Sequence, residues 1–398
     1  MKSWRTTPVM LAACAAMVVS IPLLAGPAPA GGPVARYDIR AGTTSGIGAM
    51  GGGGMMGMMF GGGGGGGNVQ HELLLRLGSS QAPAKGAAKA DHFMPSGARL
   101  GKSVQLLSGR GDSQSRDDLP EKPKGRMLLF WGCGASAPKG QPIVLDFARL
   151  AAGQVPPGLW TTTILRDWGP NPENSKSFAR WPAEDNKFIK ADSSLLGAHR
   201  IASNYAPEIA FTAARDFLAP LKVATRQQAG GATVLNWAGI PGATGYVATI
   251  FGGKQGPDGE IGDMVMWTSS ASRQFGGGLD DWLSPSQVAK LVADRTVMAP
   301  ATTSCIVPVQ VSKAAPDFRM GTLTAFGYEE NFAHPPRPAG ANAAWNPQWT
   351  ARIRHRSTTS WMDGQGMSMS GMRDAEEGSS QCKRKGGILG GAFGGGGC

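Results

Sequence analysis

Alternating hydrophobic and polar positions predict β-strands along most of this chain. In RYDIRAG (36–42) the side chains of Tyr37, Ile39 and Ala41 fall on one face and the charged ones on the other. VQHELLLRL (69–77) alternates in the same way, and a period of two residues is typical of a strand with one buried face. Runs rich in β-branched and aromatic residues, bounded by glycine and proline, predict further strands at 125–132, 141–147, 159–168, 194–214, 232–253, 264–270, 304–311, 321–330 and 350–361.

Helices are few in this pattern. Ser284-Pro285-Ser286-Gln287 forms a capping box with proline at the first helical position, which predicts a helix over 285–295. The polar segment 166–188 is interrupted by prolines and predicts a long surface loop. Short strands with few helices between them favour sandwiches over a parallel α/β sheet. We therefore predict an all-β fold: two β-sandwich-like domains, glycine-rich disordered segments and one short helix in the second domain.

The first thirty residues (1–30) predict a signal peptide. Lys2 and Arg5 precede an uncharged apolar stretch, and Ala28-Pro29-Ala30 offers small residues at a signal-peptidase site. Lipidation at Cys14 and an uncleaved anchor are the alternatives. No other uncharged stretch is apolar and long enough to span a bilayer. We predict an exported protein of the periplasm or outer cell surface, with no transmembrane segment after cleavage.

Composition divides the remaining residues into three parts. We expect an N-terminal β-rich domain at 31–217, a second domain at 218–361 and a disordered glycine-rich tail at 362–398. Within the first domain, the Gly/Met-rich stretch 48–67 predicts a disordered loop between two strands that could pair as a hairpin. Lengthening a flexible loop is inexpensive, at about 0.6 kcal/mol per doubling.

The chain is basic, with a formal net charge of +11 that falls to +9 without Lys2 and Arg5. Such a surface could contact anionic lipid, lipopolysaccharide or cell-wall polymer, or the charges could simply be dispersed for solubility. The densest basic runs are Arg352, Arg354, His355 and Arg356, then Lys383, Arg384 and Lys385. Neither run has interleaved aromatic residues, so we do not expect a nucleic-acid partner.

The second domain carries a family resemblance. In ATVLNWAGIPGATGYVATIFGG (232–253), Leu235 and Trp237 form a Leu-x-Trp pattern, and a Pro241-Gly242 turn precedes Tyr246. This stretch resembles the second and third strands of a fibronectin type III β-sandwich, and the resemblance extends over about residues 220–361. It implies that Trp237 and Tyr246 anchor a core and that the domain binds or spaces rather than catalyses. The whole chain resembles exported bacterial envelope proteins.

Four cysteines remain after cleavage of the signal peptide. Export permits disulfides, and the short loop between Cys382 and Cys398 makes that pair a possible disulfide. Cys133 and Cys305 each lie in or beside a predicted strand, where they could bridge or stay buried as thiols. Cys133 is also the best candidate nucleophile, although no histidine motif accompanies it.

Methionines suggest a soft-metal site. Thioethers at MxM and MxxM spacings suit Cu(I) or Ag(I), and low-complexity sequence without metal binding is the alternative. The candidate ligands are Met55, Met56, Met58, Met59, Met367, Met369 and Met372.

Two tryptophans in a polar loop, Trp345 and Trp349, could bind a sugar or protein partner or could serve an ordinary core. No acid–base pair at catalytic spacing emerges, so we expect no enzyme. We predict a non-enzymatic binding or structural role in the cell envelope, with a protein or an envelope polymer as partner. Cu(I) or Ag(I) binding and hydrolysis of an envelope polymer are the alternatives.

Overall fold

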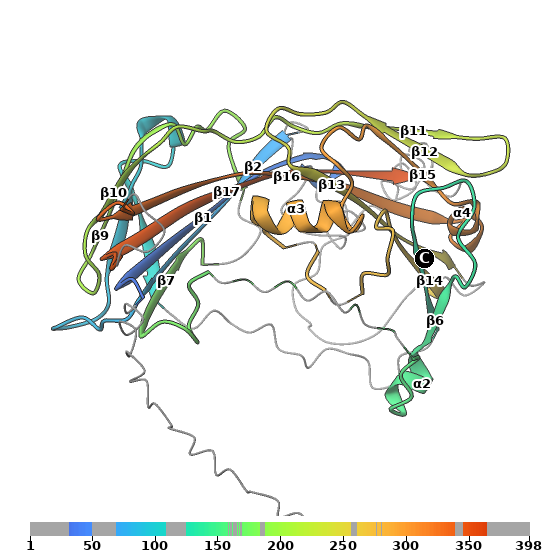
Figure 1. The fold of residues 1–398 in the computed structure, drawn as a ribbon, viewed down its shortest axis with the longest axis horizontal. Helices are drawn as coiled ribbons and strands as arrows, with labels where there is room; N and C mark the ends of the chain where they lie inside the picture. Colours follow the sequence, from blue (N-terminus) through green and yellow to red (C-terminus); the bar gives the residue numbers. More distant parts are fainter. Residues whose placement is uncertain are drawn as a thin grey trace, which may run out of the picture.

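The computed structural model describes residues 32–49, 69–108, 125–157, 159, 161, 165, 167, 169–183, 188–255, 261–275, 277–279, 281–338 and 345–363. These residues are mainly β, as predicted. They form one mixed sheet of fourteen strands and a second sheet of three strands (Figure 1).

The strands of the larger sheet come from the whole length of the chain. In chain order they are β1 (Ala35–Gly46), β2 (Val69–Ser79), β3 (Ala90–Phe93), β4 (Ser103–Ser108), β5 (Arg126–Trp131), β6 (Ile143–Asp146), β7 (Ser177–Trp181), β8 (Phe188–Ile189), β9 (Gly197–Ser203), β10 (Ile209–Ala213), β13 (Gly245–Gln255), β14 (Ile261–Thr268), β16 (Phe318–His334) and β17 (Trp349–Asp363). The smaller sheet contains β11 (Val223–Gln227), β12 (Thr233–Trp237) and β15 (Ser304–Val307).

The helical segments are short. They are α2 (Phe147–Ala151), α3 (Pro285–Ala293), α4 (Val309–Ala314) and the 3-10 turns η1 (Ile47–Ala49) and η2 (Ser96–Ala98). The predicted capping box is present in α3: Ser284 accepts a hydrogen bond from the Gln287 main chain, and the Gln287 side chain returns one to Ser284.

β1 joins the two halves of the chain. It pairs antiparallel with β2, as the two alternating runs predicted, and in parallel with β17, which is the last described strand. The described strands therefore run through a shared sheet and do not separate into two sandwiches. An unpaired strand edge leaves main-chain donors and acceptors open, and pairing β1 with β17 satisfies the edges of both.

The three-stranded sheet covers part of the larger one. β11, β12 and β15 pack over β13, β14 and β16 around a core that contains Trp237, Tyr246 and Trp267. The rings of Trp237 and Tyr246 lie 5.6 Å apart, and the Tyr246 hydroxyl accepts a hydrogen bond from the main chain of Ile240 at 3.0 Å. Both side chains thus serve as core anchors.

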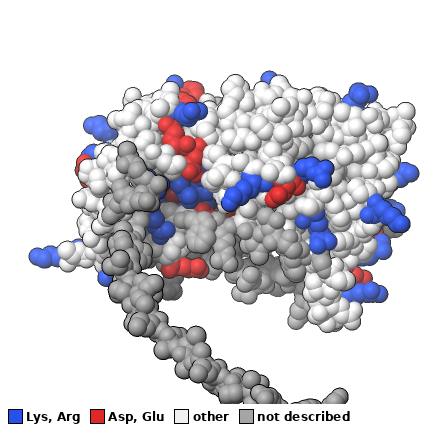
Figure 2. Space-filling model, in the orientation of Figure 1, with Lys and Arg blue, Asp and Glu red and all other residues white. Residues whose placement is uncertain are grey.

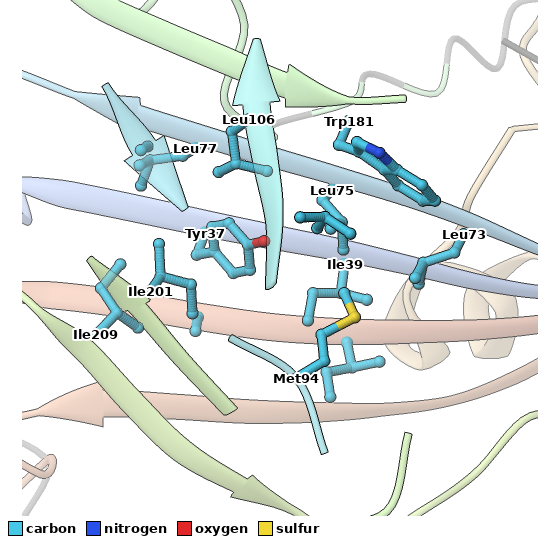
Figure 3. Close-up of a cluster of buried hydrophobic side chains, with 14 of the residues drawn as sticks. Tyr37, Ile39, Leu73, Leu75, Leu77, Met94, Leu106, Trp181, Ile201 and Ile209 are labelled. Atoms are coloured by element: carbon cyan, nitrogen blue, oxygen red, sulfur yellow. The ribbon is translucent and has the colours of Figure 1, made fainter. Parts of the chain in front are cut away.

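The other end of the large sheet curls around a second core (Figure 3). Tyr37 of β1 contacts His92 of β3, although three strands lie between β1 and β3 in the sheet order. Phe211 of β10 stacks on Phe332 of β16 with ring centroids 4.5 Å apart. The first strand of the sheet order therefore approaches the ninth.

Some local expectations were wrong. Of 159–168, four residues are described and none lies in a strand, whereas β7 lies inside the predicted loop 166–188. Strand β15 ends at Val307 because Pro308 cannot donate to a ladder, and α4 begins after it. The Gly/Met stretch from 50 to 67 and the tail from 364 onward lie outside the described residues.

Candidate functional site

A cleft of about 900 Å³ lies where β10 faces the end of β16. Its walls come from four strands and the loop before β17, so residues far apart in sequence meet here. The lining residues include Arg36, Tyr37, Ala210, Phe211, Thr212, Asn331, Phe332, Ala333, Arg337, Trp345, Trp349 and Arg352.

The structure brings both predicted partner-binding tryptophans to this cleft. Trp345 is partly exposed; its indole nitrogen donates to the carbonyl oxygen of Pro335 at 3.0 Å, and the Arg337 guanidinium lies 5.6 Å from its ring. Trp349 is only 6% exposed and stacks near His334 with ring centroids 6.1 Å apart. Trp345 is thus the accessible aromatic, and Trp349 belongs mainly to the core beneath it.

Three arginines line the cleft, and among the described residues that line it there is no aspartate or glutamate. Arg36 donates to the main-chain and side-chain oxygens of Asn174 at 2.9 and 2.7 Å. Arg337 is exposed, and Arg352 is partly buried. The lining of the cleft is therefore positively charged.

Behind Arg352 lies a buried charge cluster around Asp38 and Asp167. Asp38 has no exposed surface, and its carboxylate bonds to Arg76 at 2.5 Å, to Arg352 at 2.5 Å and to Arg354 at 3.0 Å. Asp167 pairs with Arg76 at 2.7 Å and with Arg40. Four guanidinium groups thus share two carboxylates on the polar face of β1, β2 and β17.

Electrostatics keep these carboxylates ionised. Burial alone would raise the pKa of Asp38, but the surrounding guanidinium groups, Arg354 foremost, hold that pKa well below its usual range. Burial acts in the same way on Asp167, and Arg76 and Arg40 outweigh it to lower its pKa to about 2. A further acidic neighbour, Asp281, lies 3.5 Å from Arg40. Among the described residues, the cluster with Asp281 included therefore holds four positive and three negative charges.

The sequence contained a signal for this cluster. Arg352, Arg354 and Arg356 alternate with Ile353 and His355, which places the three guanidinium groups on one face of β17. Their carboxylate partners on β1 could not be identified without the β1–β17 register. Elsewhere the basic residues are scattered: on the face in Figure 2, Lys and Arg side chains lie at separate places across the middle and at the rim, with Asp and Glu among them.

A buried chain of hydrogen bonds extends from the cleft wall into the core. The carbonyl oxygen of Leu195 can only accept, so His199 Nε2, at 2.7 Å, carries the proton. In the neutral ring His199 Nδ1 then accepts from His92 Nε2 at 3.0 Å, and His92 Nδ1 accepts from the Tyr37 hydroxyl at 2.9 Å. Burial lowers the pKa of both histidines, and for His92 the neighbouring His199 lowers it further.

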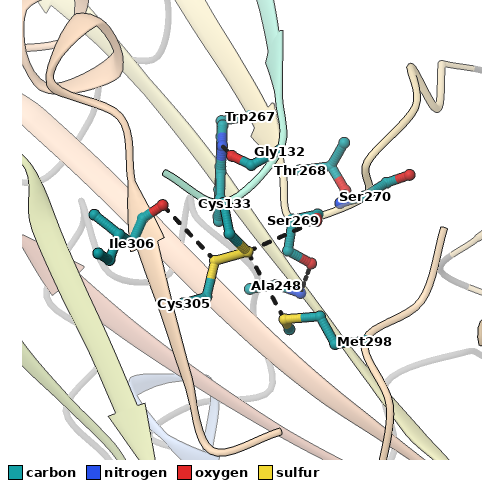
Figure 4. Close-up of a disulfide and its surroundings, with 10 residues drawn as sticks. All are labelled: Gly132, Cys133, Ala248, Trp267, Thr268, Ser269, Ser270, Met298, Cys305 and Ile306. Carbon is teal, nitrogen blue, oxygen red and sulfur yellow. Dashed lines mark hydrogen bonds between the residues drawn. A yellow bond between two sulfur atoms is a disulfide. The ribbon is translucent and has the colours of Figure 1, made fainter. Parts of the chain in front are cut away.

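Cys133 is bonded to Cys305, so it is not a thiol nucleophile (Figure 4). The structure thus chooses the bridge between the two alternatives left open for these cysteines. Cys382 and Cys398 lie outside the described residues.

All seven candidate methionine ligands also lie outside the described residues, so the metal site stays a prediction. In the part of the chain that the structure describes, no three His, Cys, Asp or Glu side chains converge as a metal site would require. No helix in that part is long and apolar enough to cross a bilayer.

The chain matches no protein-family model, and no curated protein shows significant similarity to it.

Proposed function

We propose that this chain is an exported cell-envelope protein that binds an anionic partner through the cleft, without catalysis. The observation that carries the proposal is the meeting of Trp345 with Arg36, Arg337 and Arg352 in one cleft, where none of the lining residues that the structure describes is a carboxylate. Aromatic and guanidinium groups together are typical of binding surfaces. The Cys133–Cys305 disulfide supports an oxidising compartment, in keeping with the predicted signal peptide.

Binding of polymers tests this function. Isothermal titration of the full chain with polygalacturonate and polyglutamate, against neutral dextran and polylysine, should give heat only with the two polyanions. Affinity should fall as salt rises from 50 to 300 mM, because exposed charge pairs are screened.

Two variants locate the site. Arg337→Ala should weaken polyanion binding about fivefold, the equivalent of about 1 kcal/mol for an exposed ion pair. Trp345→Ala should also weaken it, because it removes the ring against which the Arg337 guanidinium lies. Arg226→Ala, which removes the same charge from an exposed position on β11, is the matched control. Polyanion affinity unchanged in both cleft variants, or reduced as much in the control, would contradict the proposal.

We further propose that residues 218–361 are a fibronectin type III-like unit whose sheet the rest of the chain extends. In an immunoglobulin-like sandwich, the first, second and fifth strands share one sheet, and the third, sixth and seventh share the other. Here β11, β12 and β15 form one sheet, and β14, β13, β16 and β17 lie in consecutive order in the other. The parallel pairs β14–β5 and β17–β1 then add the first half of the chain at both edges.

A further inference from the structure

Two strand edges face each other across the cleft. Among the described strands, β10 has β9 as its single hydrogen-bonded neighbour, and the Glu329–His334 part of β16 pairs with β17 alone. We call the gap between β10 and Glu329–His334 the seam. Each edge presents main-chain donors and acceptors that a further strand could pair with.

The described contacts across the seam are made by side chains. Phe211 stacks on Phe332, and the Glu330 carboxylate accepts a hydrogen bond from the main chain of Ala214 at 2.9 Å. The described residues contain no main-chain hydrogen bond between the two edges. An added strand would lie about 4.8 Å from each neighbour and could bond to both at once.

The charges of the cleft indicate which kind of ligand the seam would bind. Arg36, Arg337 and Arg352 line the cleft along the seam, and the cluster behind Arg352 adds no net negative charge. Two acidic residues of β16 lie in the seam: Glu330 accepts a hydrogen bond from Ala214, and Glu329 accepts one from Asn331 at 2.8 Å. Both keep their negative charge, and the three arginines of the cleft outnumber them. An acidic ligand is therefore favoured, and main-chain pairing distinguishes a peptide from an acidic polysaccharide, which cannot form a ladder.

We propose that the seam binds an extended acidic peptide as an added strand between β10 and β16. This inference rests on the proposed function, since it names the ligand class of the same cleft. β10 has five residues, so the paired segment spans about 17 Å. The ladder supplies affinity, and the arginines select acidic side chains.

The test compares the binding of three capped hexapeptides to the full chain. The first alternates glutamate and valine, the second is the same peptide N-methylated at alternate residues, and the third has lysine in place of glutamate. The acidic peptide should bind and should slow amide hydrogen exchange in both 209–213 and 329–334. N-methylation keeps every charge but removes main-chain donors, and should weaken binding at least tenfold. Arg337→Ala should also weaken it, whereas Arg226→Ala should not.

The outcomes separate the two proposals. Equal affinity of the N-methylated peptide, or protection of one edge alone, would overturn strand addition. If polygalacturonate binds at Trp345 and the acidic peptide does not, anion binding stands and the added strand is refuted. If no anion binds, both proposals are wrong.

Discussion

Acidification should destabilise the fold through the buried Tyr37–His92–His199 chain. Both rings accept a hydrogen bond at Nδ1 and donate one at Nε2, so an added proton removes an acceptor in a site without solvent. Their exposed fractions are 0% for His92 and 1% for His199. The folded state therefore resists a proton that the unfolded state takes up at a pKa of about 6.5.

The sign and size follow from proton linkage. Because the pKa values of both histidines are lowered in the folded state, their contribution to stability is complete above about pH 6.5 and is lost as pH falls below it. Each ring that stays neutral in the folded state adds at most about 1.4 kcal/mol per pH unit to the slope of the unfolding free energy against pH, and the two rings together add about 2.7. His71 and His355 are buried with lowered pKa values as well and add to this slope.

Urea unfolding between pH 7.5 and 5.0 measures the effect in a range where most carboxylates keep their charge. His92→Leu should reduce the slope below pH 6.5 by about 1.4 kcal/mol per pH unit. It should also lower stability at pH 7.5, since the Tyr37 hydroxyl and His199 Nδ1 lose their partner at about 1–3 kcal/mol each.

Tyr37→Phe is the matched control, because it removes one hydrogen bond and leaves both titrating rings in place. It should lower stability at every pH without changing the slope. Identical slopes in the unsubstituted protein and His92→Leu would refute the reasoning.

Three further predictions concern other parts of the molecule. Asp38→Asn should lower the free energy of unfolding by about 3–5 kcal/mol, because buried guanidinium groups lose their counter-charge. Asp263→Asn, which breaks a surface pair with Arg126, should lower it far less in the same urea assay, because solvent screens an exposed pair. Replacing Cys133 and Cys305 by serine should lower the free energy of unfolding by about 2–5 kcal/mol, because their bridge closes a loop with a sequence separation of 172. Thermal unfolding measures the loss, and an unchanged midpoint temperature would contradict it. Deleting 48–67 should lower Cu(I) affinity under reducing conditions if the methionines there bind metal, and unchanged affinity would end that hypothesis.

Local signals in the sequence predicted local structure well. The alternation at 36–42 and 69–77 predicted β1 and β2, and the capping box predicted α3, because each depends on neighbouring residues alone. The alternation also suggested that the polar face of β1 meets solvent. Instead Asp38 is wholly buried, because arginines on both neighbouring strands neutralise it.

The sequence predicted only part of the cleft. Trp345 and Trp349 stood out as aromatics in a polar loop, but Arg36 and Phe211 had no local feature to connect them with that loop. These residues come together only because the sheet curls and because β1 pairs with β17. That pairing joins residues more than three hundred positions apart, such as Asp38 and Arg352. No periodicity within one strand encodes such a partner.

The parallel pairing of β1 with β17 also bears on when the protein can fold. β1 leaves the ribosome first among the described strands, and its partner at 349–360 is the last of them to be made. Until then β1 can pair only with β2, and the curled core beside it lacks Trp349 and Ile353. Contacts of such long sequence separation form slowly, because a large loop must close before they give any stability. The large sheet therefore cannot be completed until the last described strand has been made.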